Sequence, residues 1–299
     1  MPAGELRGSR AGDRDAAGEP RWGAWGLRVA GIGDAGGLLG PVPEWPVLRV
    51  SQERGDPVPA RDLPRPDPGL DPVLGERLDL PLAGGRTLRL TRAPATAVVV
   101  GRDPVPAEHL VHPYLSSAVA VFSRWLGRET LHAGAVTVDG AAWSLLGGRE
   151  AGKSSTLAWL AGRGVPVLTD DVLVVEEGTA YSGPRCLDLR ASAAHRLGRG
   201  EPLGTVGTRE RWRVALPGAP PATALGGHLL LEWGPTSVSR VPLPEALSAL
   251  LSHRGMSPSP DPRRLLALAS LPMLRLQRPR DWGALDGALE QALAAMRRV

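Results

Sequence analysis

The spacing of apolar positions divides the chain into two regions with different rhythms. Between residues 25 and 103, short apolar runs at 27–32, 47–50, 88–90 and 97–100 are separated by turns rich in proline and glycine. Such runs are typical of strands, so we predict a small β-rich N-terminal domain over residues 25–105. Residues 1–24 mix glycine with charged residues and show no apolar periodicity, which predicts a disordered arm.

In the second region, residues 106–299, segments with the apolar spacing of helices alternate with segments that have the apolar pattern of strands. An apolar stripe in 107–127 predicts a helix that starts near Pro113. Strands are predicted at 135–138, 142–146, 165–169 and 172–176, with a helix at 154–163 between the second and the third. This order predicts a βαβ unit with a parallel strand pair. Further strands at 187–189, 213–216 and 227–233, and helices at 243–252, 263–271 and 282–298, complete an α/β domain.

Composition and charge narrow the class of protein. With 299 residues, 42% of them hydrophobic, the chain can bury a large core. No run reaches the ~20 apolar residues of a membrane helix and no secretory signal is visible, so we expect no membrane partner and a cytoplasmic location. The formal net charge is only +4, without a long basic run, so nucleic acid is not an expected partner. The single cysteine, Cys186, excludes an internal disulfide and a cysteine metal cluster.

The segment between the strand at 142–146 and the following helix fits the P-loop pattern of glycine, four residues, then Gly-Lys-Ser. Glycines let the backbone wrap around phosphates, and successive N–H groups with the helix N-terminus stabilise the anion. The lysine is expected to bridge the β- and γ-phosphates, and the serine to bind Mg²⁺. The predicted nucleotide-binding residues are Gly147, Gly148, Arg149, Glu150, Ala151, Gly152, Lys153, Ser154 and Ser155.

Lys153 is the only lysine among the 35 basic residues of the chain. Arginine has replaced lysine at every other position, yet lysine remains where a compact ammonium fits between phosphates and a planar guanidinium does not. This observation strengthens the prediction of ATP binding beyond the motif itself.

Two further positions carry candidate chemistry. Asp170 and Asp171 follow directly on the strand at 165–169, which places them near the phosphates. One carboxylate can hold Mg²⁺ while the other accepts a proton from an attacking hydroxyl; the alternative is a pair that forms a turn or a helix cap. His132 precedes the strand before the loop, where a lone histidine is more often structural.

The run LHAGAVTVDGAAWSLLGGREAGKSSTLAWLAGRGVPVLTDDVLVV, residues 131–175, resembles the catalytic domain of HPr kinase/phosphorylase, in particular HPr-kinase-like proteins of actinobacterial type. That family has a His-Gly-type motif before the P-loop and an Arg-Gly turn and an Asp-Asp pair after it. Here His132 lies 21 residues before Lys153, and Asp171 lies 18 residues after it, which is similar to the family spacing. The resemblance implies a P-loop kinase domain of the type shared by HPr kinase and phosphoenolpyruvate carboxykinase.

The same resemblance implies roles for individual residues. Asp171 is expected to act as general base toward a serine hydroxyl, with Asp170 supporting the metal and His132 assisting. The segment 186–190 is similar to the family's Glu-Ile-Arg segment, so Asp188 is implied as a further metal ligand and Arg190 as its basic neighbour. The chain departs from the family in the shorter acid at 188. It departs again inside the loop, where Arg149 and Glu150 stand in place of Ser-Gly.

The implied function is an ATP- and Mg²⁺-dependent kinase that phosphorylates a serine of a protein or peptide, such as the precursor of a peptide natural product. The N-terminal domain is expected to recognise the acceptor, and family members often form oligomers. A nucleotide-binding regulatory or scaffold module with decayed catalysis is an alternative. A third is an NTPase that couples hydrolysis to movement, although no Leu-Ser-Gly-Gly-Gln-type signature is present.

Overall fold

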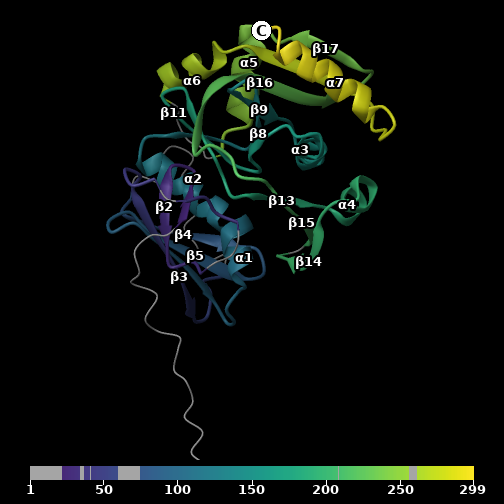
Figure 1. Ribbon diagram of the computed structural model, residues 1–299. Helices are drawn as coiled ribbons and strands as arrows, with labels where there is room; N and C mark the ends of the chain where they lie inside the picture. Colours follow the sequence, from purple (N-terminus) through teal and green to yellow (C-terminus); the bar gives the residue numbers. More distant parts are fainter. Residues whose placement is uncertain (1–21, 34–36, 41, 60–74, 208, 256–260) are drawn as a thin grey trace, which may run out of the picture.

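The computed structural model describes residues 22–33, 37–40, 42–59, 75–207, 209–255 and 261–299. In these ranges the protein is a mixed α/β structure with three β-sheets (Figure 1). The first sheet lies at one end, and the second sheet with its helices lies at the other. None of the helices in the described ranges has the length and apolar character needed to cross a membrane.

The first sheet contains six strands in the order β1-β2-β3-β6-β5-β4. The four strands expected in this region are confirmed, and the structure adds β1 and β4. Most of the predicted arm, residues 1–21, lies outside the described residues. Its last residues were predicted wrongly, because β1 pairs with β2 and Gly23 exchanges backbone hydrogen bonds with Leu39. The strands are β1 (Trp22–Ala24), β2 (Leu27–Ala30), β3 (Val47–Arg54), β4 (Arg77–Leu82), β5 (Arg86–Thr91) and β6 (Thr96–Gly101).

A helical segment connects the first sheet to the second. It comprises α1 (Ala107–His109), a turn of helix over Leu110–Tyr114, and α2 (Leu115–Trp125). His112 interrupts it with φ −153° and ψ 125°, because the ring of Pro113 disfavours helical dihedrals at the residue before it. The helix predicted to start near Pro113 is therefore confirmed as α2, whose apolar face packs on the first sheet.

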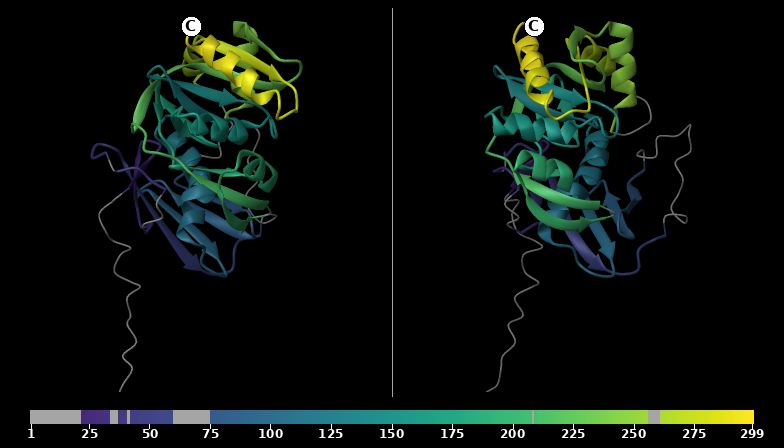
Figure 2. Two further views of the ribbon diagram at one scale, coloured as in Figure 1. Left: turned by 45° about the vertical axis from the view of Figure 1, so that its right-hand side comes forward. Right: turned by 90° about the vertical axis from the view of Figure 1, so that its right-hand side faces the viewer.

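The second sheet has nine strands arranged around the long strand β16, with helices on both faces (Figures 1 and 2). On β9, Trp143 and Leu145 pack in the same core as α3 and α7, whereas Ala142 and Leu146 share a core with α5 and α6. This alternation follows from the two-residue period of a strand. The strands are β7 (Glu129–Leu131), β8 (Gly134–Val138), β9 (Ala141–Leu146), β10 (Val167–Thr169), β11 (Leu173–Glu176), β12 (Thr179–Tyr181), β16 (Ala222–Trp233), β17 (Ser237–Arg240) and β18 (Met273–Arg278). The helices are α3 (Lys153–Gly162), α5 (Leu243–Ser252), α6 (Pro262–Ala269) and α7 (Leu285–Met296).

The predicted βαβ unit is corrected in one respect. Helix α3 does connect β9 to β10, but β8 lies between these two strands and is antiparallel to both. The reason is the tight turn at Asp139 and Gly140, which both have positive φ. Such a turn joins neighbouring strands into a hairpin. Strand β9 finds its parallel partner in β16 instead.

The third sheet is a small antiparallel unit beside α3 (Figure 2). It contains β13 (Cys186–Leu189), β15 (Arg209–Ala215) and β14 (Glu201–Val206) in that order, with α4 (Ala191–Leu197) between β13 and β14 in the chain. Only parts of β13 and β15 were expected from the sequence. This sheet supplies one wall of the candidate site.

Candidate functional site

The predicted phosphate-binding loop connects β9, which ends at Leu146, to α3, which begins at Lys153. Gly152 has φ +82°, a left-handed conformation that glycine adopts without a steric penalty. A Cβ at this position would lie 2.5 Å from Nη2 of Arg278. That arginine donates hydrogen bonds to the Ala151 carbonyl at 3.0 Å and to the Thr156 hydroxyl at 3.2 Å. The end of β18 thus holds the loop and the first turn of the helix together.

The ammonium of Lys153 folds back over the loop. Its Nζ donates a hydrogen bond to the Gly147 carbonyl at 2.7 Å. Burial lowers the pKa of Lys153, against the opposing effect of Asp170 and Asp171. The cation therefore stands at the loop, with two carboxylates as its electrostatic partners.

The two aspartates sit in a tight turn after β10. The Val172 N–H donates to the Asp170 carbonyl at 2.8 Å, and Asp171 between them has φ +68°. A hydrogen bond across a single residue with positive φ is a γ-turn of the rare, strained kind. Strain of this type costs about 1–3 kcal/mol and is found at functional sites. The turn buries Asp170, whereas the Asp171 side chain is 39% exposed.

Asp170 is a buried carboxyl group without a cationic hydrogen-bond partner among the described residues. It accepts hydrogen bonds from the Ser154 hydroxyl at 3.2 Å and from the Asp171 N–H at 2.9 Å. Burial, together with the neighbouring charge of Asp171, raises the pKa of Asp170 to about 7. This contact brings Asp170 to the serine of the predicted phosphate-binding loop.

His132 lies beside Asp171, with its Nδ1 3.4 Å from Oδ1 of the aspartate. Burial lowers the pKa of His132 from its ordinary value of 6.5, against the opposing effect of Asp171. The imidazole is therefore neutral at pH 7. A neutral histidine next to a carboxylate can orient that carboxylate or pass a proton onward.

A tryptophan from the N-terminal region supports the same turn. The indole N–H of Trp25 lies 2.9 Å from the Val172 carbonyl and 3.2 Å from the Thr169 hydroxyl. Its side chain is completely buried. The strained turn is thus held by a residue from outside the second sheet.

Asp188, on β13, has two arginines as hydrogen-bond partners and a histidine nearby. It accepts hydrogen bonds from Arg213 Nε at 2.9 Å and from Arg211 Nη1 at 3.1 Å, and His112 Nε2 lies 3.7 Å away. Although burial favours the neutral acid, the hydrogen bonds from Arg213 and the nearby positive charges lower its pKa. Arg213 also donates to the carbonyls of Glu108 and His112. This network ties the third sheet to the helical connector.

Sequence reasoning missed the arginines of this network. A signal exists, because residues 209, 211 and 213 are arginines in alternating positions, which places them on one face of a strand. No local pattern indicates that their partner is Asp188, which comes from another strand.

The donor set fits one magnesium ion in part. Neighbouring ligands of an octahedral Mg²⁺ at 2.0–2.1 Å stand about 3.0 Å apart, and the Ser154 and Asp170 oxygens are separated by 3.2 Å. The Asp188 oxygens already bind two arginines, so the predicted metal role of Asp188 does not fit this arrangement. Within the described ranges, no group of three or more His, Cys, Asp or Glu side chains could hold a metal ion. The remaining ligands would then be phosphate oxygens and water.

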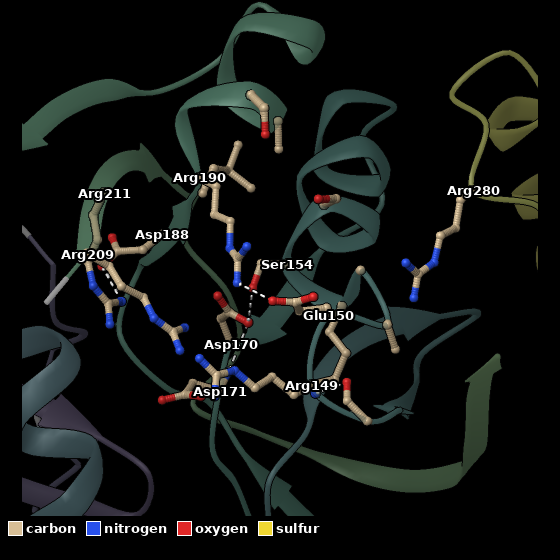
Figure 3. Close-up of a pocket in the computed structure, with 18 of the residues that line it drawn as sticks. Arg149, Glu150, Ser154, Asp170, Asp171, Asp188, Arg190, Arg209, Arg211 and Arg280 are labelled. Carbon is tan, nitrogen blue, oxygen red and sulfur yellow. Dashed lines mark hydrogen bonds and ion pairs between the residues drawn. The ribbon is translucent and has the colours of Figure 1, made fainter. Parts of the chain in front are cut away.

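These groups line one cavity of about 470 Å³ (Figure 3), a volume usual for small-molecule sites. At its edge, Arg190 Nη2 forms an exposed ion pair with Glu150 at 2.9 Å, so the predicted basic neighbour of Asp188 contacts the loop instead. Gly147 is the one predicted site residue that does not line the cavity. The predicted residues that do are His132, Gly148, Arg149, Glu150, Ala151, Gly152, Lys153, Ser154, Ser155, Asp170, Asp171, Asp188 and Arg190.

Comparisons with known proteins add little to this picture. Neither a protein-family model nor a curated protein sequence matches the chain. Among solved structures, it is similar to the Hpr(Ser) kinase/phosphatase from Coxiella burnetii, with 13% sequence identity, 57% of this chain and 96% of that chain covered, and a TM-score of 0.28. Because the TM-score and the sequence identity are both low, this likeness carries no argument about fold or chemistry. The function is therefore argued from the site.

Proposed function

We propose that the protein is an ATP- and Mg²⁺-dependent kinase that transfers the γ-phosphoryl group to a serine of a protein or peptide. One observation carries the proposal. A loop with the P-loop sequence, its lysine, a serine–aspartate pair and an aspartate–histidine pair meet in a single cavity. The loop, the lysine, the serine and the aspartates are groups with known uses in phosphoryl transfer.

The loop and the start of α3 would bind the phosphates. Their backbone N–H groups and the helix N-terminus favour an anion, and Lys153 adds a positive charge beside the loop carbonyls. Ser154 and Asp170 would hold Mg²⁺, which neutralises phosphate charge when bound. Because an opposite charge favours the ionised acid, Asp170 would be a full carboxylate in that complex.

Asp171 would take the proton of the acceptor. In the transfer, the bond from the serine oxygen to the γ-phosphorus forms while the bond from that phosphorus to the bridging oxygen of ADP breaks. The hydroxyl proton moves to the Asp171 carboxylate. The half-exposed position of Asp171 and its contact with neutral His132 support this role, since a general base needs both access and a fixed orientation.

The test is phosphate transfer measured by mass spectrometry, with ATP, Mg²⁺ and candidate serine peptides, including those encoded beside the gene. We expect a serine to gain one phosphate with the wild type and to gain none with Lys153→Ala or Asp171→Asn. Asp139→Asn, an exposed acid outside the cavity, serves as the control and should retain transfer. ATP binding without phosphate on any candidate acceptor would count against the kinase.

One feature favours the second candidate, a nucleotide-binding regulatory module. Glu150 adds a negative charge inside the phosphate-binding loop and forms an ion pair with Arg190. Asp188 forms ion pairs with two arginines, so it is not free to bind a metal ion. A wild type that binds ATP tightly, yet shows neither transfer nor hydrolysis, would support the regulatory module.

A further inference from the structure

The cavity continues past the loop to a flank that phosphoryl transfer does not use. Trp233 at the end of β16, Arg280 and Trp282 are among the residues that line the cavity, and we call them the aromatic flank. Figure 3 shows Arg280 on the opposite side of Arg149 and Glu150 from the acidic residues of the site. The cavity therefore has an acidic flank and an aromatic flank, with the loop between them.

The aromatic flank lies directly against the loop. The Trp233 ring is 3.5 Å from the position that a Cβ of Gly152 would occupy. The guanidinium groups of Arg278 and Arg280 lie 4.5 and 5.1 Å from the centre of that ring. Arg278 is used to hold the loop, whereas Arg280 has no hydrogen bond or ion pair to another described residue. Arg280 is thus a cation on the cavity wall that remains available to a ligand.

Trp282 contributes an exposed indole ring to the aromatic flank. The residue is 36% exposed, and the other large apolar residues exposed in the described ranges are leucines and a valine. An indole offers a wide flat face that gains most when a second ring covers it. Its exposure on a cavity wall, two residues after an arginine that has no hydrogen bond or ion pair to another described residue, points to a flat aromatic ligand.

The direction of phosphoryl transfer indicates which ligand this is. The attacking and leaving oxygens lie roughly in line on opposite sides of the γ-phosphorus. An acceptor that gives its proton to Asp171 approaches from the acidic flank, so the rest of the nucleotide must extend away from that flank. The aromatic flank is the part of the cavity that remains on the other side of the loop.

We propose that the aromatic flank is a nucleobase subsite, in which the base of ATP stacks on Trp282 beside Arg280. The proposal rests on the proposed function in one respect, namely that the loop binds the phosphates of the nucleotide. Stacking of a base on an aromatic side chain contributes about 1–3 kcal/mol. The subsite would make the protein prefer a purine nucleotide over a polyphosphate without a base.

The experiment compares ATP with inorganic tripolyphosphate, which lacks the base, by calorimetric titration of the full chain in Mg²⁺. For Trp282→Ala we expect ATP affinity to fall about tenfold, with tripolyphosphate affinity unchanged. Trp282→Phe keeps a ring and should restore most of the loss. Leu266→Ala, which shortens an exposed apolar side chain on α6 outside the cavity, is the matched control and should change neither affinity.

Three results would overturn the proposal in distinguishable ways. If Trp282→Ala behaves like Leu266→Ala while the wild type binds ATP, the subsite is wrong and the proposed function stands. If the wild type binds tripolyphosphate as tightly as ATP, the base has no subsite at all. If the wild type binds neither compound, nucleotide binding by the loop fails, and the proposed function fails with it.

Discussion

Two buried carboxyl groups face the same cavity, and their surroundings shift their pKa values in opposite directions. Asp170 is 5% exposed and has a hydroxyl, a backbone N–H and a second acid as neighbours, so its pKa rises to about 7. The Asp188 side chain is 2% exposed and lies among two arginines and a histidine, so its pKa falls. Burial is similar in the two cases, and the charge of the neighbours decides the outcome.

The difference separates two uses of a buried acid. Asp188 has its countercharge inside the protein, and its ion pairs join the third sheet to the helical connector. Asp170 has a nearby ammonium but no direct cationic partner among the described residues, so its ionised form gains most from a cation that arrives with the ligand. Acids whose pKa values are driven apart in one site commonly have different roles.

The largest expected effect is that of Asp171→Asn on the rate of phosphate transfer. In Asp171→Asn the proton acceptor is removed while the shape is kept, so we expect the rate of phosphate transfer to fall about 10³-fold. ATP affinity should change little, because the loop is intact. Single-turnover transfer and equilibrium ATP binding check this. A variant that retains most of its rate would remove Asp171 from the role of base.

Asp188→Ala should have the next largest effect, on stability. The change leaves Arg211 and Arg213 partly buried without their countercharge, which costs about 3 kcal/mol of unfolding free energy. The matched control is Asp56→Ala, which removes an exposed ion pair with Arg102 and should cost about 0.5 kcal/mol or less. Urea unfolding measures both. Loss of Mg²⁺ affinity with unchanged stability would make Asp188 a metal ligand after all.

Asp170→Asn tests the other half of the comparison through pH. The folded pKa, about 7, lies above the unfolded value of 3.8, so the folded protein binds this proton more tightly than the unfolded chain. Without metal, the stability of the wild type should therefore fall as pH rises from about 4 to about 7.

The asparagine variant should lack this decline and should be more stable than the wild type by a few kcal/mol at pH 8. Thermal unfolding in a chelating buffer across this pH range provides the measurement. Added Mg²⁺ should stabilise the wild type at pH 8 and have less effect on the variant. Parallel pH profiles of the two proteins would contradict the raised pKa.

The smallest effect is expected at the edge of the cavity. Glu150→Gln removes a negative charge from the loop and breaks an exposed ion pair with Arg190, so ATP affinity should rise about two- to threefold. Titration with ATP at low ionic strength measures the change. An affinity that falls instead would show that Glu150 positions the loop rather than opposing the phosphates.

The sequence predicts those parts of the site that depend on local order. The strand, loop and helix around Lys153 follow from apolar period and glycine placement, and the turn at Asp170 follows directly on a strand. The setting of Asp188 could not be predicted in this way, because its arginine partners lie 23 and 25 residues away on another strand. The insertion of β8 between β9 and β10 is likewise a consequence of pairing, which apolar period alone does not specify.

Trp25 limits how the N-terminal region and residues 106–299 can be studied as separate proteins. Its indole belongs to the N-terminal region but donates to the Thr169 and Val172 oxygens that frame the acidic turn. A chain shortened to residues 106–299 would lose this support. If the shortened chain failed to transfer phosphate, the failure could come from the disturbed turn and would not by itself show that the N-terminal region recognises the acceptor. In a chimera of two related proteins, the first sheet and the acidic turn that Trp25 supports would have to come from the same parent.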